Sequence, residues 1–117
     1  MNTNELEKKN EQNVAKIEWA EVKPAVDAFE NDEGVTVVFE VPGANSGTVD
    51  IQVDGKTLTV KAESTLTIGA RRVLFKRAFQ ISDAVDATQA TAKTVDGVLT
   101  LFLPKSERAK VHKIQVM

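Results

Sequence analysis

The chain has 117 residues, of which 42% are hydrophobic, 27% are charged and 5% are aromatic, and its formal net charge is −2. This length fits one domain that buries about two-thirds of its unfolded surface, and the near-neutral charge argues against a nucleic-acid or anionic-membrane binder. Because the chain has no cysteine and a single histidine, His112, we expect no disulfide, no thiol nucleophile, no metal site and no cofactor.

The first 23 residues are polar. Nine of them are charged, which favours solvation over packing, and Leu6, Val14 and Ile17 fit a helical stripe only loosely. We therefore predict an N-terminal arm over residues 1–23 that is partly disordered or helical, with the helix near Val14 to Trp19. Because the chain has neither an apolar signal core nor 18 consecutive apolar residues, we expect no stable membrane insertion and a cytoplasmic protein.

From Ala25 onward the apolar residues recur with a period of two, which is typical of strands. Turns are indicated at Asp54-Gly55 and Asp96-Gly97. The run Val98–Leu103 is apolar at nearly every position, which predicts a strand buried on both faces. With no long helical pattern, these segments predict an all-β protein, an antiparallel β-sandwich. The strands are expected near residues 25–30, 35–41, 49–53, 57–62, 72–81, 89–94 and 98–103, with 63–71 as a short connection.

Arg77 has the same strand parity as Phe75 and Phe79, so it points toward an apolar environment. A buried arginine needs a carboxylate partner or a subunit interface that supplies one; the alternative is an edge position from which the side chain reaches water. Residues 25–54 carry seven acidic side chains and no basic one, whereas a basic cluster lies on the strand of Arg77. Opposite charges on one surface suit self-association, so we favour the interface. The basic cluster comprises Arg71, Arg72, Lys76 and Arg77.

Ile114 and Val116 lie at the end of an otherwise polar, basic tail. In an extended chain, residues i and i+2 point the same way, so this pair can enter an apolar groove beside a strand edge. Burying the two side chains contributes about 3 to 6 kcal/mol gross, much of which is offset by ordering and association costs. The alternative is that Val111 to Val116 forms the last strand of the sandwich.

The chain offers little for catalysis. Asp83 and Asp86 lie near one turn, where aspartate usually serves turn geometry rather than acid–base chemistry. A glycine-rich phosphate loop is missing, so ATP-driven action is not expected. We interpret His112 as a solvated residue of the basic tail, and Trp19 and Phe29 as packing residues rather than a ligand platform. We therefore expect no enzyme.

Six segments together resemble the α-crystallin domain of small heat-shock proteins, in unbroken order from Pro24 to Lys105. The most specific is Ala92–Leu99, with the pattern Ala-x-x-x-Asp-Gly-Val-Leu, and Phe75–Phe79 adds Phe-x-Arg-x-Phe. Ile114-x-Val116 is similar to the C-terminal anchor of that family. The other matching segments are Pro24–Glu30, Val41–Gly43, Val53–Val60 and Leu103–Lys105.

The resemblance implies an immunoglobulin-like sandwich over residues 24–105, with residues 106–117 as a C-terminal extension. It also implies an ATP-independent chaperone, a holdase, that binds unfolding client proteins, works as a homo-oligomer built from dimers, and passes clients to ATP-driven chaperones. By the same resemblance, Ile114 and Val116 anchor the tail between two strands of a neighbouring subunit, and the strand around Arg77 forms the dimer interface. The implied groove residues are Val49, Ile51, Val53, Ala90 and Ala92, and the implied interface residues are Phe75, Arg77 and Phe79.

Two departures from the family pattern affect the assembly. Residues 63–71 replace a long loop whose strand swaps into the partner, which favours pairing of the strand 72–81 with its symmetry mate. The arm is also short and polar for a region that binds clients in the family. The alternatives are a monomeric co-chaperone adaptor of the related sandwich type, docking on an ATP-driven chaperone, and a structural or ligand-binding sandwich.

Overall fold

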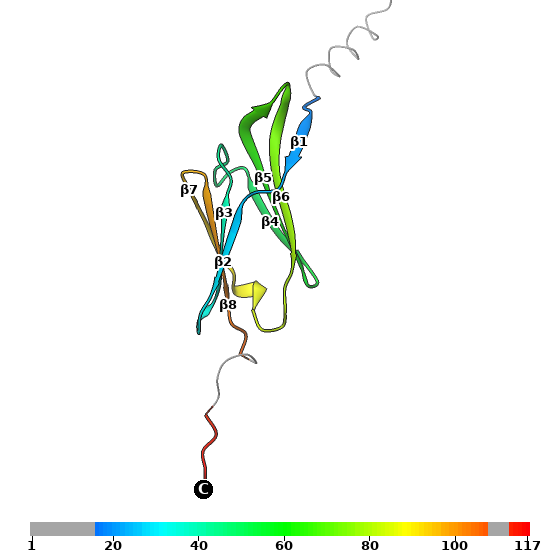
Figure 1. The fold of residues 1–117 in the computed structure, drawn as a ribbon. Helices are drawn as coiled ribbons and strands as arrows, with labels where there is room; N and C mark the ends of the chain where they lie inside the picture. The colour runs from blue at the N-terminus through cyan, green and yellow to red at the C-terminus, as the bar shows by residue number, and fades with distance from the viewer. Residues whose placement is uncertain (1–15, 108–112) are drawn as a thin grey trace, which may run out of the picture.

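The computed structural model describes residues 16–107 and 113–117, which form two four-stranded sheets. One sheet has the order β1-β6-β5-β4 and the other β2-β3-β8-β7 (Figure 1). All neighbouring strands are antiparallel except β1 and β6, which are parallel. The predicted β-sandwich is therefore confirmed. The elements are β1 (Trp19–Val22), β2 (Val26–Glu30), β3 (Gly34–Glu40), β4 (Val49–Asp54), β5 (Thr57–Ile68), β6 (Arg71–Gln80), the 3-10 turn η1 (Ala87–Gln89), β7 (Thr91–Val95) and β8 (Val98–Pro104).

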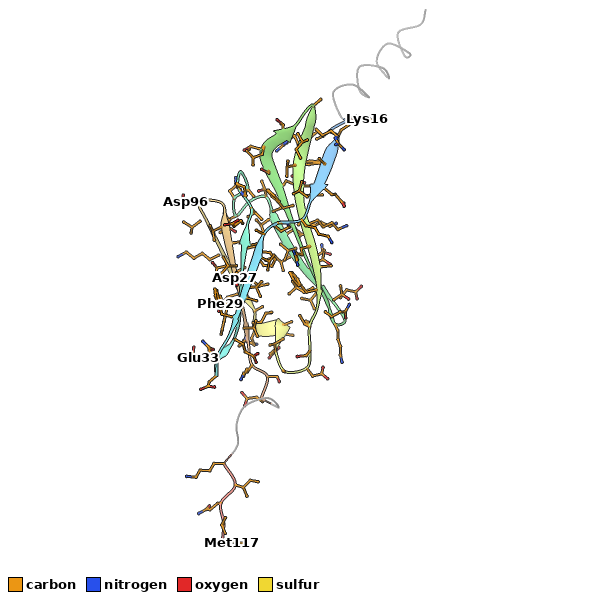
Figure 2. All side chains as sticks on the ribbon, in the orientation of Figure 1. Lys16, Asp27, Phe29, Glu33, Asp96 and Met117 are labelled. Atoms are coloured by element: carbon orange, nitrogen blue, oxygen red, sulfur yellow. The ribbon has the colours of Figure 1, made fainter. Side chains whose placement is uncertain are left out.

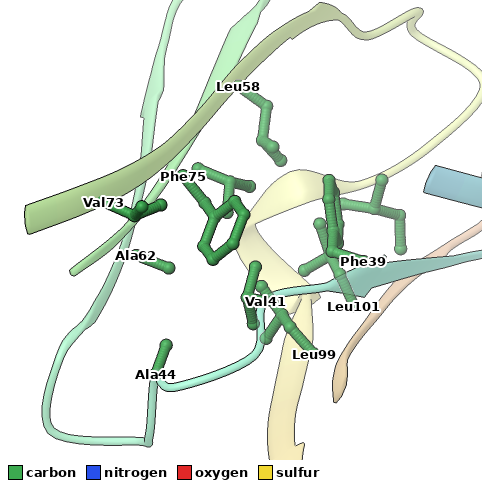
Figure 3. Close-up of a cluster of buried hydrophobic side chains, with 11 residues drawn as sticks. Phe39, Val41, Ala44, Leu58, Ala62, Val73, Phe75, Leu99 and Leu101 are labelled. Atoms are coloured by element: carbon green, nitrogen blue, oxygen red, sulfur yellow. The ribbon is translucent and has the colours of Figure 1, made fainter. Parts of the chain in front are cut away.

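The core lies between the two sheets and follows from strand alternation. On β5 every second side chain is buried, beginning at Leu58 and continuing through Val60 and Ala62. Phe39 of β3 is fully buried and meets Phe79 of β6 edge to face, with ring centroids 5.7 Å apart. Aromatic pairs prefer this geometry to a face-to-face stack. Figure 3 shows the buried cluster. Its members are Phe39, Val41, Ala44, Leu58, Val60, Ala62, Val73, Phe75, Leu99, Leu101 and Leu103.

Strand β1 corrects the expectation for the arm. Residues Trp19–Val22 pair with Arg72–Phe75 of β6, and Ala20 is 5% exposed. The helix predicted to reach Trp19 is wrong over residues 16–19, the part of that segment that the structure describes. A four-residue strand shows too little periodicity to be recognised, and its hydrogen-bond partners come from β6, more than 50 residues later. The rest of the expected arm, residues 1–15, lies outside the described residues.

The connection predicted at residues 63–71 is instead the end of a long hairpin. Strand β5 continues to Ile68 through a bulge between Glu63 and Thr67, and β6 begins at Arg71. Only two residues remain for the turn. The side chains of Leu66 and Ile68 are 46% and 50% exposed, because the hairpin extends beyond the ends of β3 and β7 (Figure 1).

Strand β8 is buried on one face only, so the prediction of burial on both faces is wrong. Leu99, Leu101 and Leu103 are at most 5% exposed, whereas Val98 is 39% exposed and Phe102 is half-buried. Val98 and Phe102 of β8 therefore face outward, away from the β1–β6–β5–β4 sheet.

Among residues 16–107 and 113–117 there is no helix that is long and apolar enough to span a membrane.

Candidate functional site

The tail residues expected to act as an anchor are fully available to solvent. Ile114 is 86% exposed and Val116 is 91% exposed. Residues 113–117 form no strand, so the alternative in which Val111 to Val116 completes the sandwich is wrong for the part of that segment that the structure describes. Because both side chains are so exposed, covering them with an apolar surface lowers the free energy.

Three of the predicted groove residues lie on β4, the last strand of its sheet. Val49, Ile51 and Val53 pair with Ala62, Val60 and Leu58 of β5, all of which are buried in the core. Opposite residues in a pair share a face, so the three β4 side chains face the other sheet. Val49 and Ile51 are half-buried, and Val53 is 44% exposed. The alternation of β4 therefore predicted their common direction correctly.

The other two predicted groove residues lie at β7, the last strand of the second sheet. Ala92 pairs with the buried Leu101 and is exposed, and Ala90 is half-buried just before the strand. Thr94 pairs with the buried Leu99 and faces the same way, a position that the alternation Ala90, Ala92, Thr94 would have identified. The two predicted residues at β7 are alanines, whose side chains are smaller than those of the valines and the isoleucine on β4.

A hydrogen bond from β6 to the connection between β1 and β2 indicates which edges of the two sheets lie on the same side. The Arg77 guanidinium on β6 donates to the backbone carbonyl of Pro24, which precedes β2, at 3.4 Å. The β1–β6 side of one sheet therefore overlies the β2 side of the other. Strands β4 and β7, which end the two sheets, consequently lie together on the other side of the sandwich.

The three predicted interface residues have different surroundings. Phe75 is 7% exposed and belongs to the core, so its side chain has little surface for a partner. Arg77 is half-buried, and its guanidinium lies 5.4 Å from the ring centre of Phe79, itself half-buried. Over residues 16–107 and 113–117 no ion pair involves Arg77; the carbonyl of Pro24 and the Phe79 ring surround it instead of a carboxylate.

The edge of β6 is partly covered. Strand β1 pairs with Arg72–Phe75, and it is held further by Glu21, whose carboxylate lies 3.8 Å from the Lys76 ammonium. Trp19 adds a cation–π contact, with the Arg72 guanidinium 5.0 Å from the ring centre. Among the described strands, none pairs with this edge between Lys76 and Gln80.

The aspartates near the β6–β7 connection have structural partners. Asp83 forms an ion pair with Lys56 at 3.5 Å, and the Asp86 carboxylate accepts a hydrogen bond from the Thr88 backbone amide at 3.0 Å, which caps η1. Within the described ranges, acidic and histidine side chains do not gather in groups of three or more that could hold a metal ion.

An apolar cavity of about 320 Å³ opens between the sheets near η1. Its walls come from both sheets and include Val37 and Phe39 of β3, Phe79 of β6, and Val85. A small apolar ligand would occupy this space if the chain were the ligand-binding sandwich considered above.

Comparisons with known proteins identify the class of protein to which this fold and this tail belong. The model of the Hsp20/alpha crystallin family matches residues 27–117, and the chain belongs to this family. The "18 kDa antigen 2" of Mycobacterium avium is 31% identical, over 80% of this chain and 76% of its own length. The "18 kDa heat shock protein" of Streptomyces albus G is 32% identical, over 78% of this chain and 71% of its own length.

A solved structure agrees with these relatives. The small heat-shock protein of Xylella fastidiosa matches with a TM-score of 0.67 and 29% identity, covering 84% of this chain and 99% of that chain. The resemblance noted in the sequence is thereby confirmed. Membership in a family of non-enzymatic chaperones supports a chaperone role for this chain.

Proposed function

We propose that this chain is an ATP-independent holdase that binds unfolding proteins and works as a homo-oligomer built from dimers. The observation that carries the proposal is a family match that extends through the tail, to residue 117, where Ile114 and Val116 are exposed. In this proposal residues 24–105 form the α-crystallin domain, to which β1 is added, and residues 106–117 form the assembly tail. The cytoplasmic location and the transfer of clients to ATP-driven chaperones stay predictions.

The tail is proposed to dock on a neighbouring subunit beside β4 and β7. The inward faces of these two edge strands offer Val49, Ile51 and Val53 on one side and Ala90 and Ala92 on the other. Each contact is weak, because ordering and association costs offset much of the gain from burying two side chains, but several contacts in one assembly act together. Heat or dilution then frees tails, and clients bind where subunits had been.

The dimer contact is proposed at the free edge of β6 from Lys76 to Gln80, beside Arg77. Its support is the absence of any described strand on this edge, since an unpaired edge is a template for another chain. Pairing over the whole of β6 would require β1 to leave Arg72–Phe75. A symmetric contact limited to the second half of the strand leaves β1 in place.

The holdase activity is tested by light scattering from a heat-aggregating client, without ATP, at increasing ratios of this protein. Suppression near stoichiometric ratios is expected. A folded protein that gives no suppression at any ratio would contradict the proposal. The adaptor alternative leaves Ile114 and Val116 without a role, and a chain that stays monomeric at micromolar concentration would favour it.

The assembly is tested by size-exclusion chromatography with light scattering on Ile114→Ala/Val116→Ala. Because the two side chains are exposed in the free chain, we expect a lower mass with no change in thermal stability of the domain. The matched control is Gln115→Ala, whose side chain points the other way in an extended segment. An unchanged mass for the double variant would rule out the tail anchor.

A further inference from the structure

The two outer faces of the sandwich differ in chemistry. The outer face of the β4–β5–β6 sheet is polar, as is usual for the solvated side of an antiparallel sheet. The outer face of the β2–β3–β8–β7 sheet carries large apolar side chains where the strands alternate outward. The polar side chains on this face are those of Asp50, Gln52, Asp54, Thr57, Thr59, Lys61 and Lys76, and the small side chain of Ala78 lies among them.

The outward apolar side chains of the second sheet, here named the outer apolar face, share that face with Thr36, Thr100 and Lys93. Phe29 of β2 and Phe102 of β8 are both aligned with Thr36 of β3, which lies between them. Val98 pairs with Val95 of β7 at the other end of the sheet. Phe29 is 55% exposed, Val95 50% and Val98 39%. The outer apolar face comprises Phe29, Val38, Val95, Val98 and Phe102.

Acidic side chains lie on the outer apolar face and at its margins. Asp27 pairs with Val38, and Glu40 pairs with Val98, so both carboxylates lie on the face itself. Glu33 lies in the turn before β3 and Asp96 in the turn before β8; Figure 2 shows both, with Asp27 and Phe29, on the outer side of this sheet. In β2, β3, β7 and β8 the single basic residue is Lys93, which pairs with Thr100 and lies on the same face, so acidic side chains outnumber basic ones there.

We propose that the outer apolar face binds client segments in which apolar residues are accompanied by lysine or arginine. Large apolar side chains that gather exposed on one face of a folded domain indicate an interaction site, and the acidic side chains on and around this face are complementary to a basic partner. The inference rests on the proposed holdase function and names the surface and the client chemistry for it.

The sequence of the arm supports this assignment. Residues 1–15 contain eleven charged or polar side chains, and Leu6 and Val14 are their only branched aliphatic residues. Residues 1–15 therefore contain few apolar side chains that could bind a client. The sandwich offers more, on a face whose shape is fixed by four paired strands.

The test uses the full chain and two fluorescein-labelled unstructured peptides that share their apolar residues, one with lysines and the other with glutamates. Fluorescence anisotropy measures the affinity for each peptide. We expect the lysine peptide to bind about tenfold more tightly than the glutamate peptide, and to lose affinity as salt is added.

The first variant is Phe29→Thr/Val98→Thr, since threonine favours strands and removes much of the apolar surface. We expect about tenfold weaker binding of the lysine peptide and weaker suppression of client aggregation. The matched control is Leu66→Thr, which removes a side chain of similar exposure on the β5–β6 hairpin. If the control loses as much affinity as the double variant, or the double variant binds like the parent, the proposal is overturned.

A second variant changes charge alone and leaves the apolar surface intact. Asp27→Asn/Glu33→Gln should lower the affinity for the lysine peptide roughly threefold and leave the glutamate peptide unchanged or better bound. This variant decides the question if Phe29→Thr/Val98→Thr fails to fold. Equal affinities of parent and charge variant for the lysine peptide would remove the proposed basic preference.

The outcomes also separate this inference from the holdase proposal. If the parent suppresses aggregation and the double variant does so equally, the outer apolar face is not the client surface although the chain is a holdase. If the parent gives no suppression, the holdase proposal fails. A double variant with unchanged peptide affinity but a lower oligomer mass would show that the face is a contact between copies of the chain, which overturns the inference.

Discussion

Replacing Ser64 with alanine tests the point at which the β5–β6 hairpin leaves the core. Ser64 is fully buried. Its hydroxyl donates to the carbonyl of Pro42 at 2.6 Å and accepts from the amide of Leu66 at 3.0 Å. The Ser64 carbonyl accepts from the Arg72 guanidinium at 3.2 Å. One residue thus links the loop after β3, the outer part of β5 and the side chain that contacts Trp19.

The cost of Ser64→Ala follows from the two backbone groups that lose their partner. An unsatisfied buried group costs about 1 to 3 kcal/mol, but Leu66 is exposed, so water can reach its amide more readily than the carbonyl under the loop. We therefore expect a loss of about 1 to 3 kcal/mol in all. For a domain of this size, that lowers Tm by roughly 5 to 15 °C.

Thermal unfolding followed by circular dichroism measures the effect. Fluorescence of Trp19, the only tryptophan, reports in the same experiment on β1, because the Arg72 side chain joins Trp19 to the Ser64 carbonyl. Ser46→Ala, an exposed serine in the loop before β4, is the control and should leave Tm unchanged. Equal Tm values for Ser64→Ala and the parent would refute the reasoning from the two hydrogen bonds.

Further substitutions separate backbone conformation from close packing. Gly55 and Gly97 both have positive φ, +60° and +76°, but a Cβ at Gly97 would lie 3.0 Å from the Pro42 Cα, whereas at Gly55 it meets nothing within 4 Å. Gly55→Ala should cost about 1 to 2 kcal/mol from conformation alone, and Gly97→Ala clearly more; equal urea midpoints would contradict the close approach. Phe39→Ala removes a fully buried ring and its contact with Phe79, with an expected loss of about 3 to 5 kcal/mol in urea denaturation. A midpoint near that of the parent would mean that the core refills the space.

Much of the sandwich could be predicted because its strands alternate strictly. Val49, Ile51 and Val53 have the spacing that places them on one face, and the structure pairs them with buried residues of β5. The failures are at β1, at the hairpin end and at β8, which is buried on one face only. Trp19–Val22 is too short to show a period, and its parallel pairing with β6 is a tertiary effect. The sequence predicts a short connection past residue 62, whereas the structure extends the hairpin there, beyond the opposite sheet.

The candidate site could be predicted in part, for related reasons. Strand parity correctly associated Arg77 with Phe79, but the backbone carbonyl of Pro24 as its partner has no signature in the sequence. The sequence favours packing for Phe29, yet this residue is 55% exposed. Parity indicates which residues share a face and not whether a second layer covers that face, so exposure at Phe29 required the structure.

Strand β8 shows why the outer apolar face is more than a by-product of strand formation. Valine and phenylalanine favour strands, but so does threonine, and Thr36 and Thr100 occupy outward positions of the same sheet. The β4–β5–β6 sheet forms its outer face with polar residues, so pairing alone does not demand apolar side chains outside. Phe29 and Val98 therefore differ from these threonines in the surface they expose and not in the strands they stabilise, which is why their threonine variants separate client binding from folding.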